Sequence, residues 1–324
     1  MNGLLIKMLQ YMLRLFSLLS VIDVLQALQV FPNKFVLGNF TKNVTLTCNT
    51  TFSDIVWKSG DDLEPIINEA NKKLHGNNLT LISVDQPDAG NYTCWNGNNL
   101  LDHHFLVIQD DENENVFSTT KDDPNKRSIN CWASSYNCSF TCTWATIHPA
   151  VFRAKITRNR NNKDVWHYLD PVKCKENTFQ QTFSYVNYSP YEEEYEPLFL
   201  KIEAMTEQSY SMIQHQLFIR DIIKPDVPDN FKVKKTGSKT NVSWTYPSTW
   251  TRPFSYFPLT SEVECMQKKK DNEIMTFKYE SGTAHIISED VQKCRLHIRD
   301  SYYNSHWSNW TPWEKVSTSY MSVQ

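Results

Sequence analysis

Two cysteines, one tryptophan and one tyrosine near the N-terminus limit the fold more than any other feature of the sequence. Cys48 ends the alternating segment "NVTLTC", Trp57 follows in "DIVWKS", and Cys94 closes "DAGNYTC". Tyr92 stands two residues before the second cysteine, at the position of a tyrosine corner. In an immunoglobulin sandwich the disulfide joins the two sheets and the tryptophan packs on it. We therefore expect an immunoglobulin-like domain at residues 29–110.

The rest of the chain also reads as β-structure. Residues 110–125, "DDENENVFSTTKDDPN", are acidic and polar, as in a linker. A second module begins at "INCWASSYNCSFTCTW", and a third follows the proline-stiffened joint "KPDVP". Segments such as "KTNVSWTYP" and "CRLHIRDSYY" have strand patterns, and no segment has the pattern of a long amphipathic helix. We expect an all-β chain with further domains at 111–222 and 223–318 and a tail at 319–324.

The N-terminal residues 1–28 have the pattern of a signal peptide. The apolar run "LFSLLSVI" is long enough for its apolar region, and Ala27 stands near a cleavage site. A membrane anchor is the alternative, but it needs about 20 uninterrupted apolar residues. Lys7, Arg14 and Asp23 interrupt the run. Since no later segment approaches that length, we expect a secreted, extracellular protein without a membrane anchor.

Cysteine and asparagine usage also favours export. The eight cysteines are an even number, as expected for disulfide pairing in an oxidising compartment. Asn-x-Ser/Thr sequons are abundant, and we expect glycosylation at Asn39, Asn43, Asn49, Asn78, Asn91, Asn137, Asn187 and Asn241. Asn309 also begins a sequon, but Pro312 follows its threonine, so we do not expect a glycan there. The net charge of −3 argues against nucleic-acid binding.

Several segments carry a specific likeness. The motif "WSNWT" near the C-terminus resembles the Trp-Ser-x-Trp-Ser motif of the class I cytokine-receptor family, with Thr311 in place of the last serine. Within that class, residues 218–231, 243–257 and 299–310 resemble the interleukin-12 beta family, whose chain is shared by interleukin-12 and interleukin-23. The resemblance implies two fibronectin type III modules after the immunoglobulin domain. It also implies a soluble beta subunit that binds a four-helix alpha chain at the elbow of the second and third domains and presents it to cell-surface cytokine receptors in immune signalling.

The cysteines divide among the domains. Cys48 and Cys94 form the sandwich bond, and the resemblance implies a second bond between Cys131 and Cys142. Cys265 and Cys294 are the two cysteines of the third domain and can pair on adjacent strands, although this departs from the family. Cys138 and Cys174 then remain and are expected to pair. A zinc site at Cys131, Cys138 and Cys142 is the alternative, which an oxidising compartment disfavours.

A covalent link to the alpha chain is not expected. The resemblance implies a linking cysteine between the Cys174 region and "FIRDII", but residues 175–264 contain none. Only Cys138 or Cys174 would remain for such a link.

The C-terminal aromatic residues divide into two groups. Arg295, His297 and Arg299 alternate, so they share one face of a strand. The resemblance implies that they stack on Trp307 and Trp310 as a structural ladder, through cation–π contacts.

The second group is a predicted partner site. The resemblance implies that Asp300 is the acidic floor of a pocket that receives an arginine from the alpha chain, flanked by Tyr302, Tyr256 and Tyr136. The alternative reading is that Asp300 only caps a turn. Tyrosine suits such a surface because it is large, stiff and able to form hydrogen bonds.

Catalytic and cofactor motifs are lacking in the sequence. There is no His-Glu-x-x-His, Gly-x-Ser-x-Gly or phosphate-binding glycine loop. His103 and His104 are adjacent, so on a strand they face opposite ways and do not form a metal pair. The run Glu192–Glu194 is interpreted as a solvated loop. We expect no enzyme activity, metal or cofactor.

Further partners and other protein classes are also compatible with the sequence. Lys268, Lys269 and Lys270 are candidate contacts for a sulfated glycan, and a homodimer is another candidate assembly. One alternative function is a soluble alpha receptor of the interleukin-6 receptor type. Another is an immunoglobulin-superfamily adhesion protein, which would explain the first domain but not "WSNWT".

Overall fold

The computed structural model describes most of the chain after the predicted signal peptide. The described ranges are 28–60, 63–109, 115–118, 128–137, 139–158, 167–175, 177–184, 189–268, 273–302 and 305–318. The signal peptide before residue 28, most of the linker, the tail at 319–324, Cys138, Asn187, Lys269 and Lys270 lie outside them. One unit comprises residues 1–118, 146–153 and 202–212, and the other comprises 119–145, 154–201 and 213–324.

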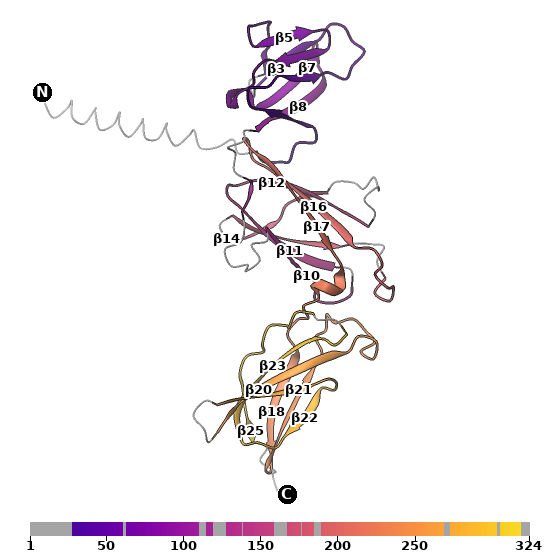
Figure 1. The fold of residues 1–324 in the computed structure, drawn as a ribbon, viewed down its shortest axis with the longest axis vertical. Helices are drawn as coiled ribbons and strands as arrows, with labels where there is room; N and C mark the ends of the chain where they lie inside the picture. Colours follow the sequence, from indigo (N-terminus) through magenta and orange to yellow (C-terminus); the bar gives the residue numbers. More distant parts are fainter. Residues whose placement is uncertain are drawn as a thin grey trace, which may run out of the picture. The chain divides into compact units, whose positions relative to one another are not determined.

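Strands dominate the described residues (Figure 1), which confirms the all-β class. The helices found in the described ranges are two short 3₁₀ turns, η1 (Gln86–Asp88) and η2 (Ile219–Ile222). None of the described helices is long and apolar enough to cross a membrane.

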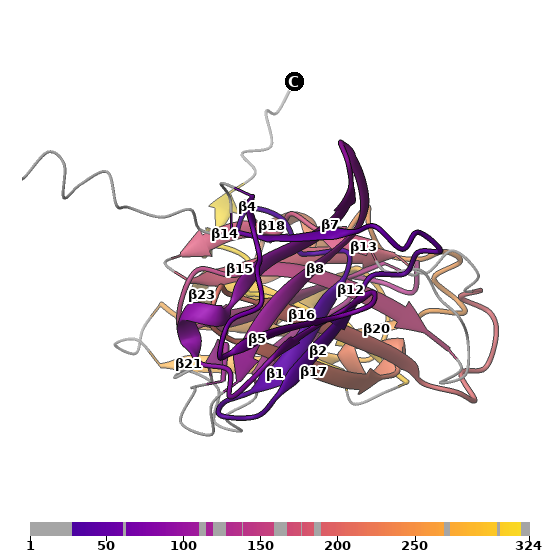
Figure 2. The ribbon, with the colours of Figure 1, turned by 90° about the horizontal axis from the view of Figure 1, so that it is seen from above.

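The first module is a sandwich of two sheets. One sheet has the order β1-β8-β7-β3-β4, in which β1, β8 and β7 run side by side (Figure 2), and the other has the order β2-β6-β5. The strands are β1 (Phe35–Asn39), β2 (Val44–Thr47), β3 (Val56–Ser59), β4 (Glu64–Pro65), β5 (Lys72–His75), β6 (Asn78–Leu81), β7 (Gly90–Asn96) and β8 (Asn99–Gln109).

The core of the first module forms around the predicted cysteine–tryptophan group. Cys48 is bonded to Cys94, and Trp57 is almost fully buried. The Tyr92 hydroxyl donates to the Asp88 carbonyl at 2.7 Å, which is the geometry of a tyrosine corner. Burial of Tyr92 raises the pKa of its hydroxyl well above the usual range, and the Asp88 carboxylate adds to this shift.

A largely buried cation, Arg153, lies within the same unit. The Arg153 guanidinium lies over the rings of Phe31 and Phe35, at 4.6 and 5.3 Å from their centroids, and donates to Glu203 at 2.6 Å. The pairing compensates the desolvation of both charges. These contacts hold residues 146–153 and 202–212 to the first module.

The second module contains two further sheets, with the orders β10-β11-β15-β14 and β13-β12-β16-β17, and β9 pairs with β11. The strands are β9 (Phe117–Ser118), β10 (Ile129–Trp132), β11 (Ser139–Thr146), β12 (Val151–Thr157), β13 (His167–Leu169), β14 (Val172–Lys175), β15 (Thr178–Ser184), β16 (Leu198–Met205) and β17 (Tyr210–Leu217). Cys131 and Cys142 face each other across β10 and β11 and are bonded.

Cys174 differs from expectation. It is exposed and carries a free thiol, whose Sγ lies 3.7 Å from the Gln180 side chain. All four residues of β14 are exposed because the strand forms one edge of its sheet. The predicted Cys138–Cys174 bond is therefore not present in the structure, and Cys138 itself lies outside the described residues.

The third module has sheets of order β22-β19-β18-β25 and β21-β20-β23-β24. The strands are β18 (Asp229–Thr236), β19 (Lys239–Thr245), β20 (Leu259–Gln267), β21 (Ile274–Tyr279), β22 (Ala284–Ile287), β23 (Val291–Asp300), β24 (Glu314–Lys315) and β25 (Ser317–Thr318). Cys265 and Cys294 are directly opposite on β20 and β23 and are bonded.

Candidate partner-binding site at a tyrosine-lined pocket

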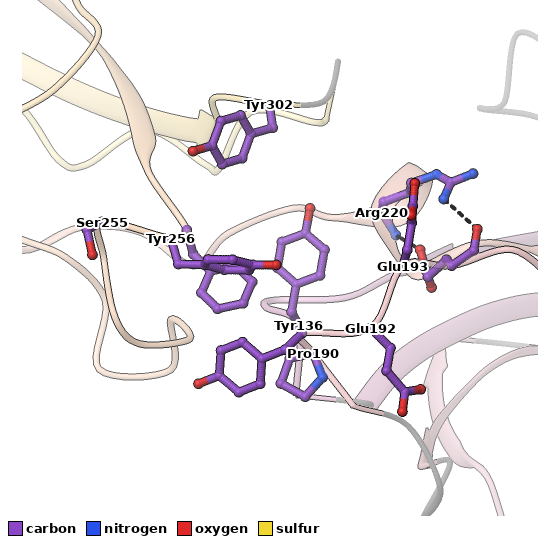
Figure 3. A pocket seen from close by; sticks show the side chains of 11 residues that line it. Tyr136, Pro190, Glu192, Glu193, Arg220, Ser255, Tyr256 and Tyr302 are labelled. Carbon is purple, nitrogen blue, oxygen red and sulfur yellow. Dashed lines mark hydrogen bonds between the residues drawn. The ribbon is translucent and has the colours of Figure 1, made fainter.

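A cavity of about 530 Å³ opens between loops of the second and third modules, all within one unit. We name it the elbow pocket. Figure 3 shows the rings of Tyr136, Tyr256 and Tyr302 gathered around it. Its lining residues are Tyr136, Pro190, Tyr191, Glu192, Glu193, Glu194, Arg220, Ser255, Tyr256, Phe257 and Tyr302.

Tyr136 is a side chain of the second module held in an aromatic socket of the third. Its ring stacks on Phe257 with centroids 5.2 Å apart and meets Trp250 edge-on at 6.0 Å. Its backbone N–H donates to the Thr251 hydroxyl at 3.1 Å, and its own hydroxyl donates to the Asp300 carboxylate at 2.6 Å. Aromatic packing of this kind restrains the ring as well as burying it. Tyr136 therefore joins the two modules at the base of the pocket.

Asp300 ends β23 and lies behind the pocket wall. It is only 2% exposed, and its second carboxylate oxygen accepts the Tyr302 backbone N–H at 2.8 Å. A buried carboxylate is costly unless it accepts hydrogen bonds, and these two donors supply them. The structure thus brings Asp300, Tyr136 and Tyr302 together, but Asp300 is not an open floor. It caps the turn at Tyr302 and also binds Tyr136.

The exposed wall of the pocket consists of tyrosine rings. Tyr256 and Tyr302 are 50% and 66% exposed, whereas Tyr136 is buried. Tyr191 meets Tyr256 at 5.6 Å, and its hydroxyl donates to the Arg252 carbonyl at 3.0 Å. Tyr191 was not predicted as a site residue. The segment "SPYEEEYEP" could have indicated it, because two tyrosines flank a run of glutamates there.

The acidic run 192–194 divides into a structural residue and a charged rim. The Glu194 carboxylate accepts the backbone N–H groups of Ile219 and Arg220 at the start of η2, at 2.9 and 3.1 Å. The Arg220 guanidinium donates back to the Glu194 carbonyl at 2.8 Å. Glu192 and Glu193 are exposed at the pocket. The interpretation of all three as solvated was therefore wrong for Glu194.

Residues 222–224, which connect the second and third modules, form backbone hydrogen bonds with both modules. Ile223 is fully buried. The Ala133 N–H donates to the Ile222 carbonyl and the Lys224 N–H to the Ala133 carbonyl, both at 2.8 Å. The His306 N–H donates to the Ile223 carbonyl at 2.9 Å. These bonds restrain the backbone beside the pocket.

The tryptophan ladder lies on the face of β23 opposite to that of Asp300. Arg295 lies over Trp310 at 4.4 Å, and Arg299 lies over Trp307 at 4.9 Å. Between them the His297 ring stacks on both tryptophans, with centroids 4.1 and 3.5 Å away. Burial lowers the pKa of His297, against the opposing effect of the hydrogen bond to Glu262.

The hydroxyl groups of the "WSNWT" motif hold the ladder to the strand. The Ile298 N–H donates to the Ser308 hydroxyl at 3.1 Å, and the Leu296 N–H donates to the Thr311 hydroxyl at 2.9 Å. Threonine keeps the hydroxyl that this bond requires, so the departure from the family's last serine leaves the ladder intact. Trp313, not included in the prediction, adds a further ring over Arg295 at 4.7 Å.

The remaining predicted residues differ in their exposure. Among the predicted glycosylation sites that the structure describes, none is buried. His104 is buried and its Nε2 lies 3.1 Å from the Thr47 carbonyl, whereas His103 is exposed. In the described ranges no group of three His, Cys, Asp or Glu residues could hold a metal ion.

Comparison with known proteins identifies the same family as the sequence motifs. Residues 126–206 match the family model described as cytokine interleukin-12p40 C-terminus, and residues 34–100 match the immunoglobulin domain model. Interleukin-12 subunit beta of Marmota monax is 32% identical over 291 residues, covering 83% of this chain and 85% of the relative. The Felis catus protein is 31% identical (82% and 84% covered), and the Homo sapiens protein is 29% identical (82% and 84% covered).

Proposed function

Because the chain belongs to the interleukin-12 subunit beta family, and is therefore a cytokine beta subunit and not an enzyme, we propose that it is exported and binds a four-helix alpha chain at the elbow pocket. In this assembly it presents the alpha chain to cell-surface cytokine receptors. The observation that carries the proposal is the cluster of exposed tyrosine rings beside two exposed glutamates.

The chemistry of the pocket favours a basic partner surface. Tyr256 and Tyr302 offer ring faces and hydroxyl groups, and Glu192 and Glu193 place negative charge beside them. Aromatic anchors that become buried at the centre of an interface commonly dominate binding energy. Negative charge at the rim mainly raises the association rate and selects the partner. An arginine of the alpha chain fits both requirements, since guanidinium groups stack on rings and bind carboxylates.

Asp300 has two roles in this proposal. It places the Tyr136 hydroxyl and the Tyr302 backbone, and its buried charge adds negative potential beneath the pocket. Direct contact between Asp300 and an incoming arginine requires the side chains around Asp300 to move, because Asp300 is only 2% exposed and is hydrogen-bonded to Tyr136. The guanidinium would then add a charged donor to the carboxylate.

Co-expression with candidate alpha chains tests the proposal. We expect a one-to-one complex in the medium, and non-reducing electrophoresis in denaturant should separate the two chains. A band that survives denaturant and shifts on reduction would instead show a covalent link, for which the exposed Cys174 is available. Strictly monomeric secretion with every helical partner would contradict the proposal and favour a soluble receptor or an adhesion protein. A homodimer would appear by light scattering of the chain expressed alone.

A second candidate partner is a sulfated glycan. The third module has a cavity lined by four lysines, Lys235, Lys268, Lys293 and Lys315. Asp290 pairs with Lys235 at 2.6 Å, so the cavity keeps a net positive charge. Binding to immobilised heparin that falls on Lys268→Gln and Lys293→Gln substitution would support this role, and unchanged binding would contradict it.

A further inference from the structure

Tyr195 stands out in the loop that borders the elbow pocket. It is 80% exposed, and the residues around it, 193–195, have no regular secondary structure. Glu192, Glu193 and Glu194 precede it, and Glu196 follows it. An exposed phenol in an acidic loop is accessible to a modifying enzyme.

We propose that Tyr195 is a site of tyrosine O-sulfation during export. The proposal rests on the proposed function, since it needs the chain to pass through the secretory pathway. An enzyme that transfers a sulfuryl group from an anionic donor needs cationic groups around its active site. A tyrosine flanked by carboxylates is attracted to such a site.

The reaction balances with a nucleotide sulfate as the donor. The phenol oxygen of Tyr195 bonds to the sulfur of a phosphoadenosine phosphosulfate, which carries a second phosphate on its ribose, as the bond from sulfur to the phosphate oxygen breaks. The phenolic proton passes to a base of the transferring enzyme, and the adenosine bisphosphate leaves. No oxidation or reduction takes place. In the resting chain the Tyr195 hydroxyl donates to Glu193 at 2.6 Å, but both groups are exposed, so this bond is weak and easily exchanged.

Tyr191 in the same loop provides a matched comparison. Its ring packs on Tyr256 and Phe257, and its hydroxyl donates to the Arg252 carbonyl. The residue before it is Pro190, so it lacks an acidic neighbour on that side. Tyr191 is 57% exposed, but its ring would have to leave these contacts to enter an enzyme. The structure therefore favours Tyr195 over Tyr191 as the acceptor.

Sulfation would strengthen the proposed binding site. A sulfate ester carries one fixed negative charge at physiological pH. It would lie beside Glu193, which lines the elbow pocket. Added charge at the rim raises the association rate with a basic partner, and salt weakens the effect.

Mass spectrometry of the exported chain tests the site. The full chain is expressed in animal cells, purified from the medium and digested, and the peptide containing residues 191–196 is weighed. We expect a gain of one SO₃ group that resists phosphatase, is lost in mild acid, disappears in Tyr195→Phe and remains in Tyr191→Phe. Blocking sulfation with chlorate should slow association with the alpha chain by roughly twofold to tenfold at low salt.

The outcomes separate this site from the proposed function. An exported chain that binds the alpha chain but carries an unmodified peptide would overturn sulfation alone. A gain that persists in Tyr195→Phe, or that phosphatase removes, would also overturn it. A chain that never reaches the medium would overturn both proposals.

Discussion

The tryptophan ladder and the elbow pocket both combine aromatic rings with charged groups, but the charges differ in sign and the rings differ in exposure. In the ladder, Arg295 and Arg299 of the same chain lie over Trp310 and Trp307. In the pocket, Tyr256 and Tyr302 remain at least half exposed beside acidic residues, and Arg220, which also lines it, lies over Phe218. The ladder is therefore complete within the chain, whereas the pocket has rings and negative charge that a partner can use. We infer that an aromatic cluster of this protein is structural where the cation over its rings comes from the same chain. It is a binding site where the cation is supplied by a partner.

Removing a ladder ring should have the largest effect on stability. Trp310→Ala removes the contacts to Arg295 and His297, and we expect a loss of about 2–4 kcal/mol in the free energy of unfolding of the third module, somewhat below the cost for a fully buried tryptophan. Denaturant unfolding followed by fluorescence measures it. Trp310→Phe is the matched control and should recover part of the loss. An unchanged midpoint for Trp310→Ala would contradict the structural role.

Asp300 should affect binding more than the ladder does. We expect Asp300→Ala to weaken alpha-chain binding by about 2–5 kcal/mol, because it removes a buried charge and frees the donors at Tyr136 and Tyr302. Titration by calorimetry measures the change. Asp300→Asn keeps the shape and one acceptor, so a smaller loss is expected. Near-wild-type affinity for Asp300→Ala would show that the residue has no role in binding the alpha chain.

The Tyr136→Phe variant distinguishes a positioning role of this residue from direct contact with the alpha chain. Tyr136→Phe keeps the ring in its socket but leaves one oxygen of the buried Asp300 without its donor. We expect the isolated chain to lose about 1–3 kcal/mol of stability, the usual cost of an unsatisfied buried group. Faster amide exchange at Tyr302 and Asp300, whose N–H groups donate to the Asp300 carboxylate and to the Ser305 hydroxyl, should accompany it in the absence of any partner. If exchange is unchanged while binding falls, Tyr136 acts only by touching the partner.

His297 should make the ladder sensitive to pH. Its pKa is lowered in the folded chain, chiefly by burial, so the folded state binds fewer protons than the unfolded state near the ordinary histidine pKa. Stability is therefore fully present above about pH 6.5 and falls as the pH drops through the lower folded pKa. Thermal unfolding of the wild type and His297→Gln at pH 7.5 and 5.5 measures this. The variant should lose less stability on acidification, and equal losses would contradict the assignment. His104, whose pKa burial also lowers, is unchanged in both proteins.

Neutralising the rim should have the smallest effect. Glu192→Gln and Glu193→Gln together should slow association by roughly threefold at low salt and leave dissociation nearly unchanged, because exposed charges act at a distance. Stopped-flow kinetics at two salt concentrations measures both rates. A change confined to dissociation would mean that these glutamates form tight contacts.

The sequence predicted the features that depend on local residue patterns. Alternation placed Arg295, His297 and Arg299 on one strand face, and the spacing of Cys48, Trp57 and Cys94 predicted the sandwich. The resemblance placed Tyr136 beside Asp300, but it did not predict their hydrogen bond or the burial of Asp300, which depend on how segments 164 positions apart pack. Nor did it predict which glutamate would cap η2, since that depends on how the loop at 189–197 packs against residues 219 and 220.

The central claim is that the exposed tyrosines of the elbow pocket bind the alpha chain. The most direct test is a titration of purified chain with a purified four-helix alpha chain, comparing wild type, Tyr302→Ala and Ile286→Ala. Ile286 is similarly exposed on β22 of the same module and does not line the pocket, so it controls for loss of exposed apolar surface. We expect Tyr302→Ala to raise the dissociation constant by at least about tenfold, equal to about 1.4 kcal/mol, with Ile286→Ala unchanged. Equal affinities for all three proteins would contradict the account.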